Sequence, residues 1–195
     1  DESFYISKVS VSDAAIALEA LQNETKEFIS HVIDYSLDSF NLEENLKTNH
    51  ATQKKFHSKP VAEKYDYIKQ LHGEMHGFYL KLQHTTLANE ETERLNQLIS
   101  SIRNIMYAAK NIRDAQHDIL QISNSSNDIK YSFYILSREK LLNFYQRIQL
   151  LLDKQKGTNH FDELSAVYQS INKGYSEALQ SLYKESLARH VSETE

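Results

Sequence analysis

Two histidines, His72 and His76, lie four residues apart in the segment His-Gly-Glu-Met-His. On a helix, this spacing places both imidazoles on one face, where they could bind one metal ion. The glutamate of this segment does not directly follow the first histidine, as the His-Glu-x-x-His arrangement of zinc proteases requires. A third ligand would have to come from another helix. We therefore interpret the pair mainly as boundary histidines beside the apolar residues Met75 and Phe78, with metal binding as the alternative.

Two carboxylates, Asp114 and Asp118, show the same four-residue spacing in Arg-Asp-Ala-Gln-His-Asp. Carboxylates on one helix face can hold a hard cation or an iron ion when a second helix supplies further ligands. The cations Lys110 and Arg113 are close enough in sequence to pair with them instead. The main interpretation is therefore a solvated helix face with internal ion pairs, and a metal site is the alternative.

Other kinds of chemistry have little support in the sequence. The chain has no Cys, which excludes disulfides, thiolate metal sites and cysteine nucleophiles. It also has no Gly-x-Ser-x-Gly elbow, no Walker motif and no Gly-x-Gly-x-x-Gly loop. The net charge of -5 argues against nucleic-acid binding. The sequence therefore indicates a protein that is not an enzyme, with no cofactor and no small-molecule substrate identified.

The elements that would position these residues are predicted to be helices. Only 4 Gly and 1 Pro occur in 195 residues, and the sequence contains neither Asn-Gly nor Asp-Gly. Sheet proteins need such residues for their turns, so this scarcity favours an all-α fold. Apolar residues recur at alternating spacings of three and four, which is typical of long amphipathic helices. Helices are expected at about 12–42, 61–86, from Asn89 to beyond Ile119, 128–155 and 159–190.

These five helices are expected to form an elongated antiparallel bundle in a single domain, 1–195. The domain would have a lead-in at 1–11, a polar connector at 43–59 and a frayed tail at 191–195. Asp13 and Asn89 are expected to cap helices, and Pro60 to stand where one begins. In the last helix, Gly174 predicts a close helix crossing. The core positions expected there are Phe161, Leu164, Tyr168, Ile171, Tyr175, Ala178 and Leu182.

The third helix carries a resemblance to a known family. The segment from Ile102 to Ile112 resembles the signature helix of PhoU-like proteins, approximately Glu-Arg-Ile-Gly-Asp-His-Ala-x-Asn-Ile. The opening helix, with Ala-Leu-Glu-Ala-Leu at 17–21 and Asn-Glu at 23–24, is similar to the start of the PhoU-like tail of bacterial sodium/phosphate cotransporters. The resemblance extends loosely from Phe4 to Leu187. Arg103, Asn111 and Ile112 match the family pattern.

Two departures concern metal binding. Ile102 and Tyr107 stand where the family has acidic residues. Because those acids belong to the clusters that bind metal in metal-containing PhoU proteins, the resemblance does not carry the family's metal function to this chain.

The resemblance implies a regulatory or accessory domain in phosphate uptake, on the cytoplasmic face of the cell membrane. Its partner would be a transmembrane transporter portion of the same chain, and a homo-oligomer is left open. The alternative is an extracytoplasmic four-helix sensory bundle of a chemoreceptor or sensor kinase, which would also be long, helical and free of Cys. The final Ser-Glu-Thr-Glu favours a true terminus over a run into a membrane, and therefore the first interpretation.

Overall fold

A computed structural model describes residues 2–42, 55–153 and 160–189. Every regular element in these ranges is helical and none is a strand, which confirms the predicted all-α class. The chain divides into two compact units, Asp1–Ala115 and Gln116–Glu195. None of the helices in the described part is long and apolar enough to cross a membrane.

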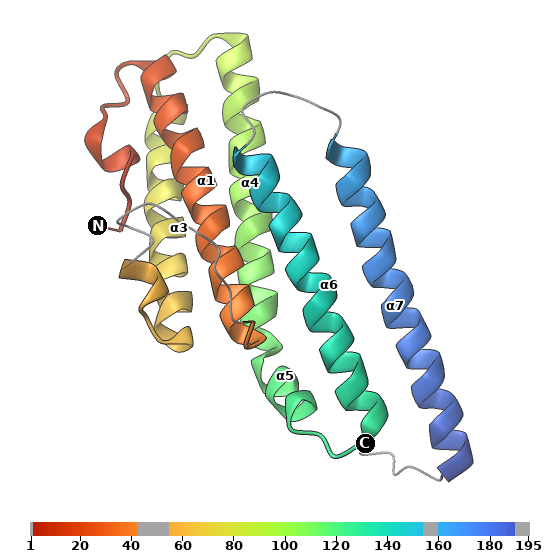
Figure 1. Ribbon diagram of the computed structural model, residues 1–195. Coiled ribbons are helices and arrows are strands. Elements are labelled where there is room, and N and C mark those ends of the chain that lie inside the picture. Colours follow the sequence, from red (N-terminus) through yellow and green to blue (C-terminus); the bar gives the residue numbers. More distant parts are fainter. Residues whose placement is uncertain (1, 43–54, 154–159, 190–195) are drawn as a thin grey trace. The chain divides into compact units, whose positions relative to one another are not determined.

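The first unit is a bundle of three long helices. Its helices are α1 (Ala14–Ser39), α3 (Val61–Gln83) and α4 (Asn89–Asp114), and each packs against the other two. Helix α3 runs antiparallel to α1 and α4 (Figure 1). One continuous core fills the space between them. Its fully buried side chains include Leu18, Leu21, Phe28, Ile68, Leu71, Met75, Leu82 and Ile102.

The helix ends show how local sequence sets these bounds. The Asp13 carboxylate accepts a hydrogen bond from the Ile16 N–H, which confirms the predicted cap of α1. Asn41 adopts a left-handed conformation with φ of 50°, and the Leu42 N–H donates to the Leu37 carbonyl at 2.9 Å, which ends α1. Pro60 directly precedes α3, as expected. The predicted cap at Asn89 is wrong by one residue, because Ala88 is the cap and its N–H donates to the Glu91 carboxylate.

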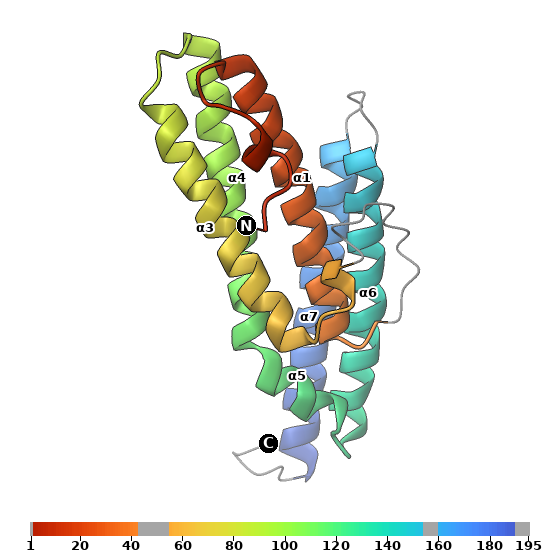
Figure 2. The same cartoon turned by 90° about the vertical axis from the view of Figure 1, so that its left-hand side faces the viewer.

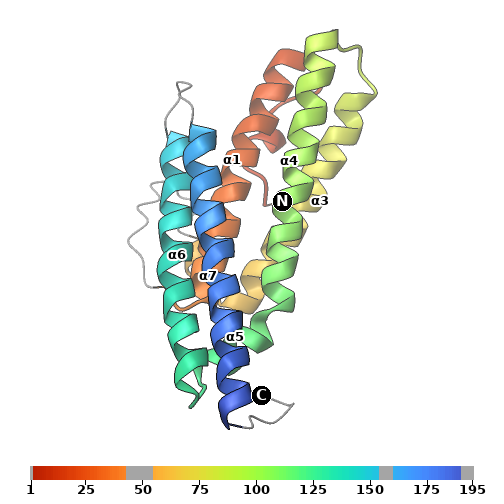
Figure 3. The same ribbon diagram turned by 90° about the vertical axis from the view of Figure 1, so that its right-hand side faces the viewer.

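The second unit contains α5 (Gln116–Ser123), α6 (Asp128–Asp153) and α7 (His160–Arg189). Helices α6 and α7 lie side by side and antiparallel (Figure 3). The Asn127 side chain accepts hydrogen bonds from the Ile129 and Lys130 N–H groups and so caps α6. Gly174 on α7 is buried, and the Lys140 side chain of α6 occupies the space where a Cβ would be. The predicted close helix crossing at Gly174 stays a prediction, because the neighbour at this glycine is the end of a long side chain and not the α6 main chain.

The prediction of five helices is wrong in the third, which ends at Asp114; after Ala115 a separate helix, α5, begins.

The connector expected at 43–59 is described only from residue 55, where 55–57 form a helical turn and Phe56 is buried. The tail expected at 191–195 lies outside the described residues. The lead-in is packed against the first unit, and Figure 2 shows it beside α1 and α3.

Candidate functional site

A groove between α3 and α4 brings three of the candidate residues together. It encloses about 440 Å³ and is partly open to solvent. Helix α3 contributes His72, His76 and Tyr79, so the four-residue spacing does place both histidines on one face. Helix α4 contributes Ile99, Arg103, Met106 and Tyr107. The family-matching arginine therefore faces the same space as the histidine pair.

Aromatic rings line the α3 side of this groove. The His72 ring lies 6.2 Å from the Phe28 ring of α1 and 6.4 Å from the His76 ring, measured between centroids. The His76 and Tyr79 centroids are 6.0 Å apart. These spacings fall in the range of aromatic pairs that support each other in a core. The α3 wall is thus a row of packed rings, half-buried at His72 and exposed at His76.

The electrostatics of the groove favour a neutral His72. Burial lowers the pKa of His72, and the neighbouring His76 lowers it further. The one permanent charge on the groove lining is the exposed guanidinium of Arg103, and no carboxylate belongs to the lining. The groove therefore suits uncharged apolar or anionic groups of a partner better than cationic ones.

Within the described ranges, no third metal ligand joins the two histidines. Two imidazoles could hold an ion only weakly without a third ligand, because protein metal sites usually take three or four protein ligands. No group of three or more His, Cys, Asp or Glu side chains that could hold a metal occurs in the part of the chain that the structure describes. The packed rings agree with the interpretation of His72 and His76 as boundary histidines.

The four-residue spacing of Asp114 and Asp118 suggested one continuous helix, but the two residues lie on different helices. Helix α4 ends at Asp114 and the first unit ends at Ala115, whereas Asp118 lies in α5 of the second unit. The Asp114 carboxylate pairs with the guanidinium of its neighbour Arg113, 2.6 Å away, and both side chains are about half exposed. An ion pair of this kind, between neighbours on an exposed helix face, is what our main interpretation of this segment expects. Arg113 also donates to the Tyr65 hydroxyl, 3.1 Å away.

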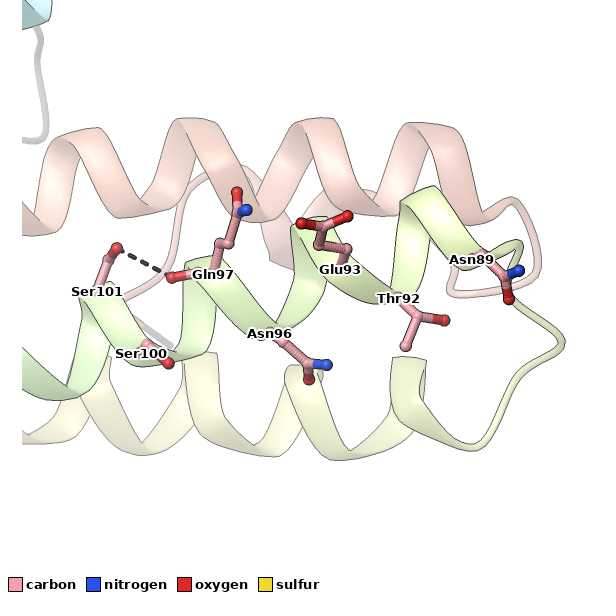
Figure 4. A pocket seen from close by; sticks show the side chains of 7 residues that line it. All are labelled: Asn89, Thr92, Glu93, Asn96, Gln97, Ser100 and Ser101. Carbon is pink, nitrogen blue, oxygen red and sulfur yellow. Dashed lines mark hydrogen bonds between the residues drawn. The ribbon is translucent and has the colours of Figure 1, made fainter.

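A second hollow lies along the N-terminal half of α4 and is lined only by residues with polar side chains. It is wider and more open, about 640 Å³, and all of its lining residues come from α4 (Figure 4). The Ser101 hydroxyl donates to the Gln97 carbonyl at 3.0 Å, within the helix itself. Such a face can form hydrogen bonds with a polar partner but holds no reactive group. Its lining is Asn89, Thr92, Glu93, Asn96, Gln97, Ser100 and Ser101.

A charge cluster around a buried lysine joins α1 and α3, and no sequence pattern predicted it. The ammonium of Lys64 is fully buried, and it contacts the carboxylates of Asp34 at 2.8 Å and Asp38 at 2.5 Å. The ring of His57 contacts the other oxygen of Asp34 at 2.9 Å. This cluster joins the helical turn at 55–57 to α1. Because removal of the two carboxylates would leave the buried Lys64 ammonium unpaired, we assign the cluster a structural role.

Comparisons with known proteins leave the family open: no protein-family model matches the chain, and neither a curated protein nor a solved structure matches it.

Proposed function

We propose that this chain is a PhoU-like, non-catalytic accessory domain that regulates sodium-dependent phosphate transport. It would act on the cytoplasmic face of the cell membrane, on a transmembrane portion of the same protein. The support is the resemblance of residues 102–112 to the signature helix of PhoU-like proteins. A second support is that residues 103, 107 and 111 of this segment are exposed at the bundle surface.

The exposed side of α4 is the observation that carries the proposal. Arg103 and Asn111, the two polar residues that match the family pattern, both have exposed side chains, whereas Ile112 packs against the core. Tyr107, halfway between the two polar residues, is 57% exposed. Residues spaced by four share a helix face. The family-matching polar residues thus form one strip with an exposed aromatic, which the bundle itself does not use for packing.

We call Arg103, Tyr107 and Asn111 the α4 strip. A guanidinium and a phenol are residue types that often dominate protein–protein interfaces, because each combines apolar area with hydrogen bonding. A bundle can control a transporter only by binding one of its conformations better than another. The α4 strip, continuous with the groove through Arg103 and Tyr107, is the surface that we assign to this contact.

The test measures sodium-dependent phosphate uptake by cells that express the complete parent protein. The variant Arg103→Ala/Tyr107→Ala should change uptake, or its response to phosphate supply, several-fold. The matched control is Ser101→Ala/Asn104→Ala, which also alters two exposed residues of α4 and should leave uptake unchanged.

Two results would remove the proposal. One is equal uptake by the two variants at equal expression. The other is a parent gene without membrane-spanning segments before Asp1. Membrane-spanning helices on both sides of the chain would instead favour the sensory bundle.

A further inference from the structure

The N-terminal segment, residues 2–9, is held to the first unit by two carboxylates. The Glu24 carboxylate of α1 accepts hydrogen bonds from the N–H groups of Phe4, Tyr5 and Ile6, the shortest being 2.6 Å from Tyr5. The Glu74 carboxylate of α3 accepts from the N–H groups of Glu2 and Ser3, the latter at 2.8 Å. Five successive main-chain donors are thus bound by two side chains.

Glu24 would be unfavourable in the bundle without these donors. Its side chain is buried, with 1% of the residue exposed, and a buried carboxylate is costly unless hydrogen bonds satisfy it. The N–H groups of residues 4–6 supply those bonds. Hydrogen bonds to an ionised acceptor are also stronger than neutral ones. The bundle therefore contains a site whose chemistry is complete only when main-chain N–H groups occupy it. Here these groups come from the turn that leads into the 3-10 helix Ile6–Lys8.

Few side chains of the segment contribute to this contact. Of residues 2–13, only Ile6 is buried, and it packs into the core of the first unit. Phe4 is 40% exposed and lies under the Lys8 ammonium, 3.2 Å from the ring centroid, which is a contact within the segment. At the start of the N-terminal segment, the Tyr67 hydroxyl donates to the Glu2 carbonyl at 3.1 Å. Recognition thus rests on main-chain groups and on Ile6, with Tyr5 and Val9 partly buried against the core.

We propose that Glu24, Glu74 and Tyr67 form a peptide-binding site for a segment that turns into a short 3-10 helix, and that residues 2–6 are its exchangeable occupant. The ligand class is a main chain with five successive N–H donors and an aliphatic side chain at the fifth. A second copy of this chain offers the same segment, so the same site can take it in exchange between copies. The peptide site does not depend on the transport role proposed above.

The first experiment measures binding of a labelled peptide of residues 1–11 to the full chain. The variant Ile6→Asp weakens the chain's own segment, because it places a carboxylate in an apolar position next to Glu24, and it should bind the peptide. The wild-type chain should bind at least about tenfold more weakly, because its own segment competes. Adding Glu24→Gln to Ile6→Asp should abolish binding, whereas adding Glu19→Gln, on an exposed residue of α1, should not.

Equal binding to the Glu24→Gln and Glu19→Gln variants would overturn the proposal. Absence of binding to Ile6→Asp, when circular dichroism shows its helices intact, would do the same.

The second experiment covers the case in which Ile6→Asp does not fold. Amide hydrogen exchange of residues 4–6 is measured in the full chain with single substitutions. Glu24→Gln should accelerate exchange at these amides at least about tenfold relative to Glu19→Gln, while the amides of α3 keep their rates. If residues 4–6 exchange only together with α3, the segment is not separable from the bundle and the proposal is wrong.

Discussion

Helices α3 and α7 have similar apolar patterns but very different degrees of burial. On α3, the apolar residues at spacings of three and four are all buried: Tyr65, Ile68, Leu71, Met75, Phe78 and Leu82. On α7, the predicted core residues Tyr168 and Tyr175 are 60% and 54% exposed, so their assignment to the core is wrong. In their own units, α3 packs against both α1 and α4, whereas α7 packs against α6. A helix with one neighbour buries one narrow strip, whatever the width of its apolar face.

The residue types differ in a way that fits this contrast. The α3 core uses Ile68, Leu71 and Met75, which have no polar atom to satisfy except a thioether sulfur. The exposed side of α7 carries three tyrosines, Tyr168, Tyr175 and Tyr183. A tyrosine offers an apolar ring and a hydroxyl that can stay in water, so it tolerates a half-covered position. The period of a pattern therefore predicts a helix. Because α3 also buries Tyr65 and Tyr67, the extent of burial follows from the number of helices packed against each helix and not from residue type alone.

The largest expected effect comes from truncating a leucine in each unit. Leu71→Ala on α3 removes a fully buried side chain and should lower the free energy of unfolding by about 3 kcal/mol. Leu187→Ala on α7 alters a residue that is 83% exposed and should change it by less than about 0.5 kcal/mol. Urea unfolding followed by circular dichroism measures both. Equal losses for the two variants would show that the exposed side of α7 is buried in solution and would remove the contrast.

Much of the fold was predictable because it rests on local signals. The bounds of α1, α3, α6 and α7 follow from apolar spacing, the Asp13 cap and Pro60. The break after Asp114 was not predictable, because Ala115 is a good helix former and the apolar spacing continues to Ile119.

The candidate site was predictable only within one helix. The spacing of His72 and His76 placed both on one face, but no local pattern brings Arg103 to the same groove. That requires the packing of α3 against α4. The burial of Lys64 was unpredictable for the same reason. Its partners Asp34 and Asp38 lie on another helix, 30 and 26 residues away in sequence.

The second effect is a dependence of stability on pH that belongs to the first unit. His31 of α1 is buried between the rings of Phe56 and Tyr67, whose centroids lie 4.3 Å and 5.3 Å away. Burial lowers the pKa of His31 to about 4, with Asp34 opposing the shift and Lys64 adding to it. The ordinary pKa is 6.5, so between pH 6.5 and about 4 the unfolded chain binds more protons than the folded one. Stability should therefore fall as pH drops through this range, by roughly 3 kcal/mol in total.

Substitution of this histidine isolates its share of the pH dependence. His31→Phe cannot take up a proton, so the loss of stability between pH 6.5 and 4 should shrink by most of that amount. The control is His117→Phe in the second unit, where the histidine is exposed. It should keep the full pH dependence of the wild type. Thermal unfolding at half-unit pH steps measures both, and parallel curves for the two variants would contradict the assignment to His31.

The smallest effect concerns the α6–α7 crossing at Gly174. Alanine is favoured over glycine inside a helix by about 1 kcal/mol, but a Cβ here would meet the end of the Lys140 side chain. The Lys140 ammonium donates to the Ser170 carbonyl at 3.0 Å and would have to give up this bond. Gly174→Ala should therefore change the free energy of unfolding by less than about 0.5 kcal/mol.

A double-mutant cycle separates the two contributions at this crossing. In a Lys140→Ala background the obstacle is gone, so Gly174→Ala should stabilise α7 by the full helix-propensity difference of about 1 kcal/mol. Hydrogen exchange of the α7 amides is the measurement, because it reports on the second unit separately. Additive effects would show that the Lys140 side chain moves aside without loss. In that case the Lys140 side chain would not require glycine at this position, and the contact between α6 and α7 would tolerate a methyl group there.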